Sequence, residues 1–87
     1  MTAYIANTLI SGWSGSESSD GLAKARAVYE ELGRERREPS TYEAMARACL
    51  AAGETGLARS VVGEAMRRGY PAAVVGRIVE LVKGDEA

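Results

Sequence analysis

The sequence contains two pairs of polar residues whose members are four positions apart. Each pair lies in a segment whose apolar residues recur at helical spacing. Asn7 is followed by Ser11, and Glu43 is followed by Arg47. Because residues i and i+4 lie on one helix face, each pair presents its polar groups together. The amide and hydroxyl of the first pair could contact a nucleobase and a phosphate, although an exposed polar stripe is the more ordinary interpretation. The second pair favours a surface ion pair, worth about a few tenths of a kcal/mol, whose arginine could also meet a phosphate.

The residue types of the chain argue against catalysis. The sequence contains no histidine, so it lacks the commonest general base and the commonest metal ligand. It has no nucleophile–base pair, no metal-ligand cluster and no phosphate-binding glycine loop. Its single cysteine, Cys49, is expected to be a small core residue. The sequence therefore predicts a binding module rather than an enzyme, with no catalytic residues, metal or cofactor.

Length and charge restrict the possible partners. With 87 residues, the chain is long enough for one small domain. The chain contains eleven Lys and Arg residues and twelve Asp and Glu residues, which gives a formal charge of −1. Nucleic-acid-binding domains, in contrast, usually have an excess of basic residues. No apolar run approaches the roughly 20 residues that cross a bilayer, and the N-terminus shows no targeting pattern. We expect no membrane association, and the near-neutral charge counts against RNA as a ligand.

Apolar spacing and stop signals predict five helices. In the first helix, Ile5, Leu9 and Trp13 are expected to share one face, with Ala6 and Ile10 beside them, and Trp13 is expected to be a core or inter-repeat anchor. The alternating charges of residues 34–38, which precede Pro39, indicate a solvated turn. The predicted helices cover about residues 3–13, 20–36, 40–52, 55–68 and 71–83.

The first two predicted helices resemble the third and fourth. Leu9 matches Met45 at an offset of 36 (45 − 9), and Ala25 matches Ala58 at an offset of 33 (58 − 25). The difference places three additional residues in the polar loop near residues 14–20. A period near 34 with two helices per unit is typical of a helical-hairpin solenoid, whose units bury their apolar faces by stacking. We therefore predict an all-α helical-hairpin repeat fold, with repeats at about 3–38 and 40–70 and a closing helix at about 71–83.

Several segments resemble the pentatricopeptide repeat family. Residues 7–13, Asn-Thr-Leu-Ile-Ser-Gly-Trp, are similar to the opening helix of that repeat, and residues 25–32 are similar to its second helix. The second half of the chain follows the same template at residues 40–45 and 58–62, and residues 66–71 match the closing turn. The resemblance covers about residues 3–72 and leaves the last predicted helix outside it.

This resemblance implies binding of single-stranded RNA, within a larger mitochondrial or plastid factor for RNA processing, stability or translation. In such proteins the fifth residue of the first helix and the last residue of the repeat together recognise one base. The corresponding residues are Asn7 with Ser40 in the first repeat, and Glu43 with Ala72 in the second. Glu43 departs from the usual Asn, Ser or Thr, and Ala72 cannot hydrogen-bond through its side chain. The second repeat therefore resembles a degenerate site for base recognition.

Two functions are expected as alternatives. As a protein–protein interaction scaffold, the chain would bind a partner helix, or a second copy of itself through the Val74–Val82 face, a role that near-neutral charge suits better. As an RNA-binding module, it would use polar residues on the first helix of each repeat, namely Asn7, Ser11, Ser40, Glu43 and Arg47.

Overall fold

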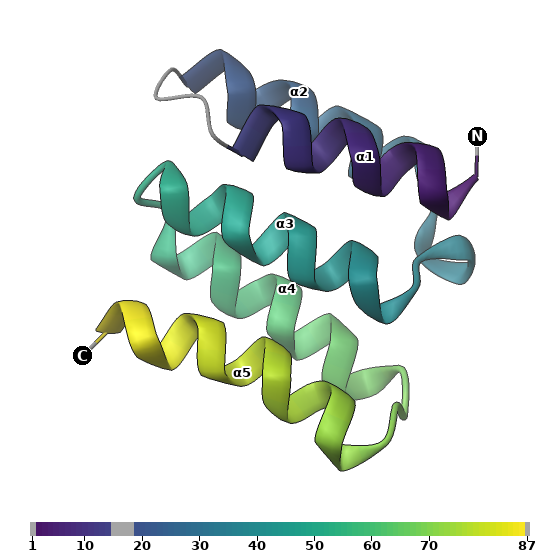
Figure 1. The fold of residues 1–87 in the computed structure, drawn as a ribbon, viewed down its shortest axis with the longest axis vertical. Helices are drawn as coiled ribbons and strands as arrows, with labels where there is room; N and C mark the ends of the chain where they lie inside the picture. The colour runs from purple at the N-terminus through teal and green to yellow at the C-terminus, as the bar shows by residue number, and fades with distance from the viewer. Residues whose placement is uncertain (1, 15–18, 87) are drawn as a thin grey trace.

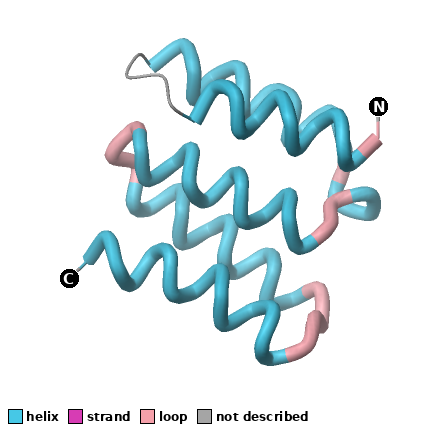
Figure 2. Tube along the Cα trace, in the orientation of Figure 1, coloured by secondary structure: helices cyan, strands magenta, loops and turns pink. Residues whose placement is uncertain are grey.

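The computed structural model describes residues 2–14 and 19–86 and confirms the all-α prediction. Five α-helices follow one another, and no strand occurs within the described ranges (Figure 2). Most of the polar loop expected near residues 14–20 lies outside the described residues. The helices are α1 (Ala3–Ser14), α2 (Ser19–Leu32), α3 (Pro39–Ala51), α4 (Thr55–Arg67) and α5 (Ala72–Glu86), with a short 3₁₀ helix, η1 (Arg34–Arg36), after α2.

The helices form two layers. Helices α1, α3 and α5 lie side by side in a front layer, and α2 and α4 lie behind them (Figure 1). The Cα atoms extend over 33 × 32 × 16 Å along the principal axes, as in a slab two helices thick. Each of the first two hairpins thus has its first helix in the front layer and its second in the rear layer, the arrangement of stacked hairpin repeats. The repeat bounds of 3–38 and 40–70 stay a prediction.

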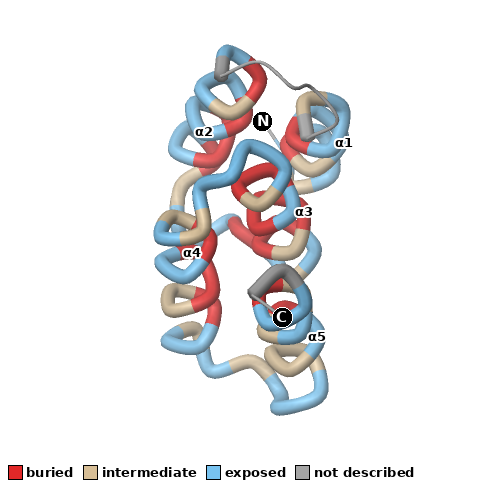
Figure 3. The backbone as a smooth tube through the Cα atoms, turned by 90° about the vertical axis from the view of Figure 1, so that its left-hand side faces the viewer, coloured by how far each residue is buried: buried red, intermediate tan, exposed pale blue. Residues whose placement is uncertain are grey.

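The buried side of α1 differs from the predicted one. Ala6 and Ile10 are fully buried, whereas Ile5 and Leu9 are 48% and 37% exposed. Trp13 is partly buried and packs against the core. Helix α1 contacts both α2 and α3, so its buried stripe follows steps of three and four residues through Ala6, and Ile5 and Leu9 lie beside that stripe. Figure 3 shows the buried residues concentrated where the two layers face each other.

Helix α2 ends at Leu32, although the sequence predicted a helix that continued to residue 36. Gly33 combines a φ of 82° with a ψ of 146°, a non-helical conformation that glycine accepts more readily than other residues, so the helix cannot continue through it. The chain then passes through η1 and reaches Pro39 in the first turn of α3, where its fixed φ suits helix initiation. This route buries Arg37, which is 6% exposed. The prediction of a solvated turn over residues 34–38 was therefore wrong for Arg37.

Helix α5 packs against α3 and α4. Ile78 and Val82 are buried, and Val74 and Val79 are half-buried. Much of the apolar face that was predicted to mediate self-association is therefore used in contacts within the chain. Across the described ranges, the helices are too short or too polar to traverse a bilayer.

Candidate nucleic-acid interface

The two residues assigned to base recognition in the first repeat are in direct contact. The side-chain amide nitrogen of Asn7, on α1, donates a hydrogen bond to the hydroxyl of Ser40, on α3, over 2.7 Å. The Asn7 carbonyl oxygen Oδ1 is buried and has no hydrogen-bond partner among the described residues. Because a buried acceptor without a partner is costly, packing must hold this amide in place. The amide retains an unused hydrogen-bonding group.

Helix α1 contributes polarity to the front layer but no charge. Ser11 lies one turn after Asn7 and is exposed. The helix sequence, Ala3 to Ser14, contains no acidic or basic residue. The charge that the front layer presents therefore comes from α3 and α5.

The charged part of the front layer is centred on Glu43. Its carboxylate accepts a hydrogen bond of 2.9 Å from Arg47, the i, i+4 pair expected from the sequence. The guanidinium of Arg77, on α5, lies 3.5 Å from the other carboxylate oxygen. The Arg47 and Arg77 side chains are 59% and 74% exposed. Because ion pairs this exposed contribute about 0–1 kcal/mol, either arginine can exchange Glu43 for another partner at little cost.

Arg77 was not singled out by the sequence analysis. The resemblance assigned Ala72 as the partner of Glu43, but Ala72 begins α5 and is exposed, and the observed contact is with Arg77. Arg77 follows Glu43 by 34 residues (77 − 43), which is the repeat period. A search for polar residues one period after Glu43 would have found it.

A groove runs between α3 and α5 around Glu43. Its floor and walls combine charged, polar and apolar side chains from both helices. Glu38 and Glu80 also line it, so the groove has no excess of positive charge. The residues that line it include Ser40, Glu43, Arg47, Val74, Arg77 and Ile78.

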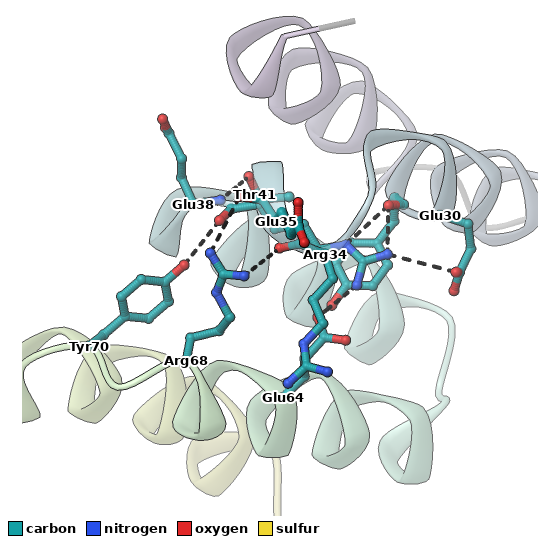
Figure 4. A network of polar contacts seen from close by, with 10 residues as sticks. Glu30, Arg34, Glu35, Glu38, Thr41, Glu64, Arg68 and Tyr70 are labelled. Atoms are coloured by element: carbon teal, nitrogen blue, oxygen red, sulfur yellow. Dashed lines mark hydrogen bonds and ion pairs between the residues drawn. The ribbon is translucent and has the colours of Figure 1, made fainter.

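A second polar cluster, which we call the Arg37 network, joins the two hairpins. The Arg37 guanidinium donates two hydrogen bonds to the backbone carbonyl of Tyr29, at 3.1 and 2.9 Å, and pairs with Glu64 at 2.7 Å (Figure 4). It also lies over the Tyr29 ring, 3.8 Å from the ring centroid, a favourable cation–π arrangement. Tyr29 belongs to α2 and Glu64 to α4, so Arg37 connects the rear helices of successive hairpins.

Two residues that follow α4 extend this network toward η1. Arg68 donates hydrogen bonds to the backbone carbonyls of Arg34 and Glu35, at 2.8 and 3.4 Å. The Tyr70 hydroxyl donates to the backbone carbonyl of Arg37 at 3.0 Å (Figure 4). The turn between the hairpins is thereby fixed to the end of the second hairpin.

Three tyrosines pack beside the Arg37 network. The Tyr42 ring makes edge-to-face contacts with Tyr29 and Tyr70, with ring centroids 6.1 and 6.0 Å apart. Tyr42 is fully buried, and its hydroxyl makes no well-aligned hydrogen bond within the described residues. The Tyr29 hydroxyl, in contrast, donates to Glu64 at 2.9 Å. Removal of the Tyr29 hydroxyl should therefore lower the free energy of unfolding more than removal of the Tyr42 hydroxyl.

These groups have shifted pKa values. Burial, and then the Glu64 carboxylate, raise the pKa of Tyr42 to about 12. Burial and the hydrogen bond to Glu64 also raise the pKa of Tyr29. Burial alone would raise the pKa of Glu64, but the hydrogen bonds from Arg37 and Tyr29 outweigh it, so that pKa is lowered. The network thus favours a charged carboxylate beside two neutral phenols.

Stability should consequently fall at both ends of the pH range. A raised pKa in the folded state means that the tyrosine contribution is complete below the ordinary value of 10.0 and is lost as pH rises above it. The lowered pKa of Glu64 means that its contribution is complete above the ordinary value of 4.5 and is lost as pH falls through the folded-state pKa. Urea unfolding at a series of pH values measures the loss of stability at both the acid and the alkaline end. Tyr29→Phe should reduce the loss of stability at alkaline pH. A free energy of unfolding that stays constant in the unmodified chain between pH 9 and 11 (about one unit either side of the free phenol pKa) would contradict this prediction.

The architecture defines the chain as an α-helical hairpin repeat protein. Sequence comparison finds 39% identity over 85 residues with a protein named "pentatricopeptide repeat-containing protein 5, mitochondrial" from Schizosaccharomyces pombe. The match covers 94% of this chain and 6% of the relative, so the chain spans a small part of that protein's length. No protein-family model and no solved structure matches the chain. The chain is thus similar in sequence to part of a pentatricopeptide repeat-containing protein, and its stacked hairpins agree with a helical-repeat fold.

The candidate residues of the sequence analysis all lie on the front layer. Asn7 and Ser40 form one contact, and Glu43 and Arg47 form another. Ser11 lies on α1, beyond Asn7. Their role in binding RNA stays a prediction.

Proposed function

We propose that the chain binds single-stranded RNA and acts as a binding module. The observation that supports this most directly is the succession of polar sites along the front layer. The Asn7–Ser40 contact joins α1 to α3, and the Glu43–Arg77 contact joins α3 to α5. Their separations in sequence are 33 and 34 residues. Such regularly spaced hydrogen-bonding groups suit recognition of the splayed bases of a single strand.

The module would act within a longer protein that processes, stabilises or translates organellar RNA. The name of the Schizosaccharomyces pombe relative includes the word mitochondrial, which favours a mitochondrial over a plastid location. Two hairpins offer contacts to few nucleotides. Because phosphate contacts supply most non-specific affinity and this chain has a formal charge of −1, the chain alone should bind RNA weakly.

Replacement of Asn7 and of Arg47 should affect RNA binding in different ways. Asn7→Ala should change the preference among bases, because the Asn7 amide would contact a base edge. Arg47→Ala should weaken binding to all sequences alike and reduce the slope of log affinity against log salt by about 1. Fluorescence anisotropy with labelled oligonucleotides at two salt concentrations measures both effects.

Arg67→Ala is the matched control for charge. Arg67 is also an exposed arginine, but it lies at the end of α4, in the rear layer. Its removal changes the net charge by the same amount and should leave the affinity closer to that of the unmodified chain. If the unmodified chain binds no oligonucleotide at low salt, the RNA-binding proposal is wrong.

A protein–protein interaction scaffold is the second candidate function, favoured by the outer surface of α1. Tyr4, Ile5 and Leu9 are 79%, 48% and 37% exposed on a helix without charged residues. An uncharged apolar strip of this kind suits packing against a helix of a partner protein. In that case, RNA binding would be absent at low salt, and Ile5→Arg would abolish association with the partner.

A further inference from the structure

We infer that Glu43 and Arg77 together recognise a guanine base, an inference that rests on the RNA-binding function proposed above. The two side chains come from neighbouring front-layer helices and meet in the groove between α3 and α5. Both line the same open groove, so a planar ligand can approach the carboxylate and the guanidinium together.

The charge of the groove favours a neutral ligand group over a phosphate. Two guanidinium groups, those of Arg47 and Arg77, line it. Three carboxylates, those of Glu38, Glu43 and Glu80, line it as well. A phosphate placed between the two helices beside Glu43 would meet more negative than positive charge, whereas the exposed side of Arg47 (59% exposed) can still contact a phosphate outside the groove. A nucleobase edge has no net charge and needs both donors and acceptors, which this groove supplies.

The order of donors and acceptors on guanine matches this pair. Guanine presents N1–H and the N2 amine as adjacent donors, and O6 and N7 as adjacent acceptors. The Glu43 carboxylate accepts two hydrogen bonds side by side, and the Arg77 guanidinium donates in a planar fork. Adenine has an acceptor at N1 and a donor at N6. The Glu43 carboxylate, an acceptor, would therefore face the N1 acceptor, and the Arg77 guanidinium, a donor, would face the N6 donor. The pair is therefore complementary to guanine and mismatched with adenine.

The contact between the two side chains is loose enough to admit a base. The Arg77 nitrogen lies 3.5 Å from the Glu43 oxygen, longer than the 2.9 Å hydrogen bond from Arg47. Arg77 is 74% exposed, so most of its donors face solvent. Beside the pair, the half-buried Val74 lines the groove with apolar surface on which a base face can rest. Binding then replaces the ion pair with Arg77, and the exposed hydrogen bond from Arg47 to the other Glu43 oxygen, by hydrogen bonds from the base to Glu43 and from Arg77 to the base.

The test compares RNA heptamers that differ at one position. The 87-residue chain, labelled with ¹⁵N, is titrated with uridine heptamers that carry guanine, inosine or adenine at the centre, and amide shifts in α3 and α5 are followed. Guanine should bind about tenfold more tightly than adenine. Inosine, which lacks the N2 amine, should fall between them. Glu43→Ala and Arg77→Ala should each abolish the preference, whereas Arg67→Ala should retain it.

The possible outcomes distinguish a failure of guanine recognition from a failure of RNA binding itself. Both substituted residues are solvent-accessible, so the variants should fold, and circular dichroism verifies this. If all heptamers bind with equal, salt-dependent affinity, guanine recognition is wrong and RNA binding stands. If guanine is preferred but both variants keep the preference, another site recognises it and the inference is wrong. If no heptamer binds at low salt, both the inference and the proposed function are wrong.

Discussion

Replacing Arg37 by alanine should lower the free energy of unfolding by about 3 kcal/mol. The change leaves the Glu64 carboxylate without its closest cation and the Tyr29 carbonyl without both of its side-chain hydrogen bonds. A small domain has only about 5–15 kcal/mol of stability to lose. Urea denaturation followed by circular dichroism measures the effect. Because the network joins α2 to α4, we expect the two hairpins to separate as well as the local turn to loosen.

Arg36→Ala is the control for this experiment. Arg36 is the preceding residue and is exposed, so its replacement should change the stability by less than about 0.5 kcal/mol. A double replacement, Arg37→Met with Glu64→Leu, should recover much of the loss, because apolar pairs often replace buried ion pairs without a net cost. Equal, small effects of Arg36→Ala and Arg37→Ala would show that the Arg37 network does not stabilise the fold.

Tyr42→Ala should cost about 4 kcal/mol, the range found when a buried aromatic ring is removed. The ring is fully buried between Tyr29 and Tyr70, so its loss leaves a cavity and removes two edge-to-face contacts. Tyr42→Phe should change the stability by less than about 1 kcal/mol, because the hydroxyl has no well-aligned hydrogen bond to lose. Thermal and urea unfolding of the two variants measures the contrast.

Tyr29→Phe provides the comparison for the phenol group. It removes a hydrogen bond of 2.9 Å to Glu64, and hydrogen bonds to charged groups contribute about 1.5–3 kcal/mol. Tyr29→Phe should therefore destabilise the chain more than Tyr42→Phe does. The reverse order would show that the Tyr42 hydroxyl, rather than that of Tyr29, makes the stronger hydrogen bond to Glu64 and would contradict this prediction.

Much of the fold was predictable because helical spacing and stop signals are local. The helices begin and end within a few residues of their predicted bounds, and glycines with positive φ, at Gly53 and Gly69, mark two of the turns. The error at the end of α2 has a physical cause. The predicted helix continued past Gly33, but the positive φ and extended ψ of this glycine end the helix before it.

The side of α1 that is buried could not be predicted from its own sequence. Ile5, Leu9, Ala6 and Ile10 are all apolar, so two overlapping faces were available. Contact with both α2 and α3 selects the face that contains the small Ala6, and small side chains allow helix axes to approach closely. The choice depends on neighbours that a single helix cannot reveal.

The candidate site could be predicted only in part, again because contacts between distant residues leave no local signal in the sequence. The family resemblance indicated Asn7 and Ser40, and these residues are in contact. Arg37 was missed because a charged residue in a polar run gives no local sign of a distant partner, and Arg77 was missed because the apolar residues around it give no sign of the helix that it faces. Arg77 could have been found from the period of 34 residues that separates it from Glu43, whereas the burial of Arg37 depends on the turn at Gly33.

The sequential packing of the helices has a consequence for how the chain folds and opens. Its main contacts join helices that are adjacent or next to adjacent in sequence, and α3 alone packs against all four others. Such short-range topology favours fast folding, on the order of microseconds to milliseconds. It also allows the outer helices to detach without global unfolding. The groove around Glu43 has α5 as one wall, so transient release of that helix would dismantle the groove while α1 to α4 remained assembled.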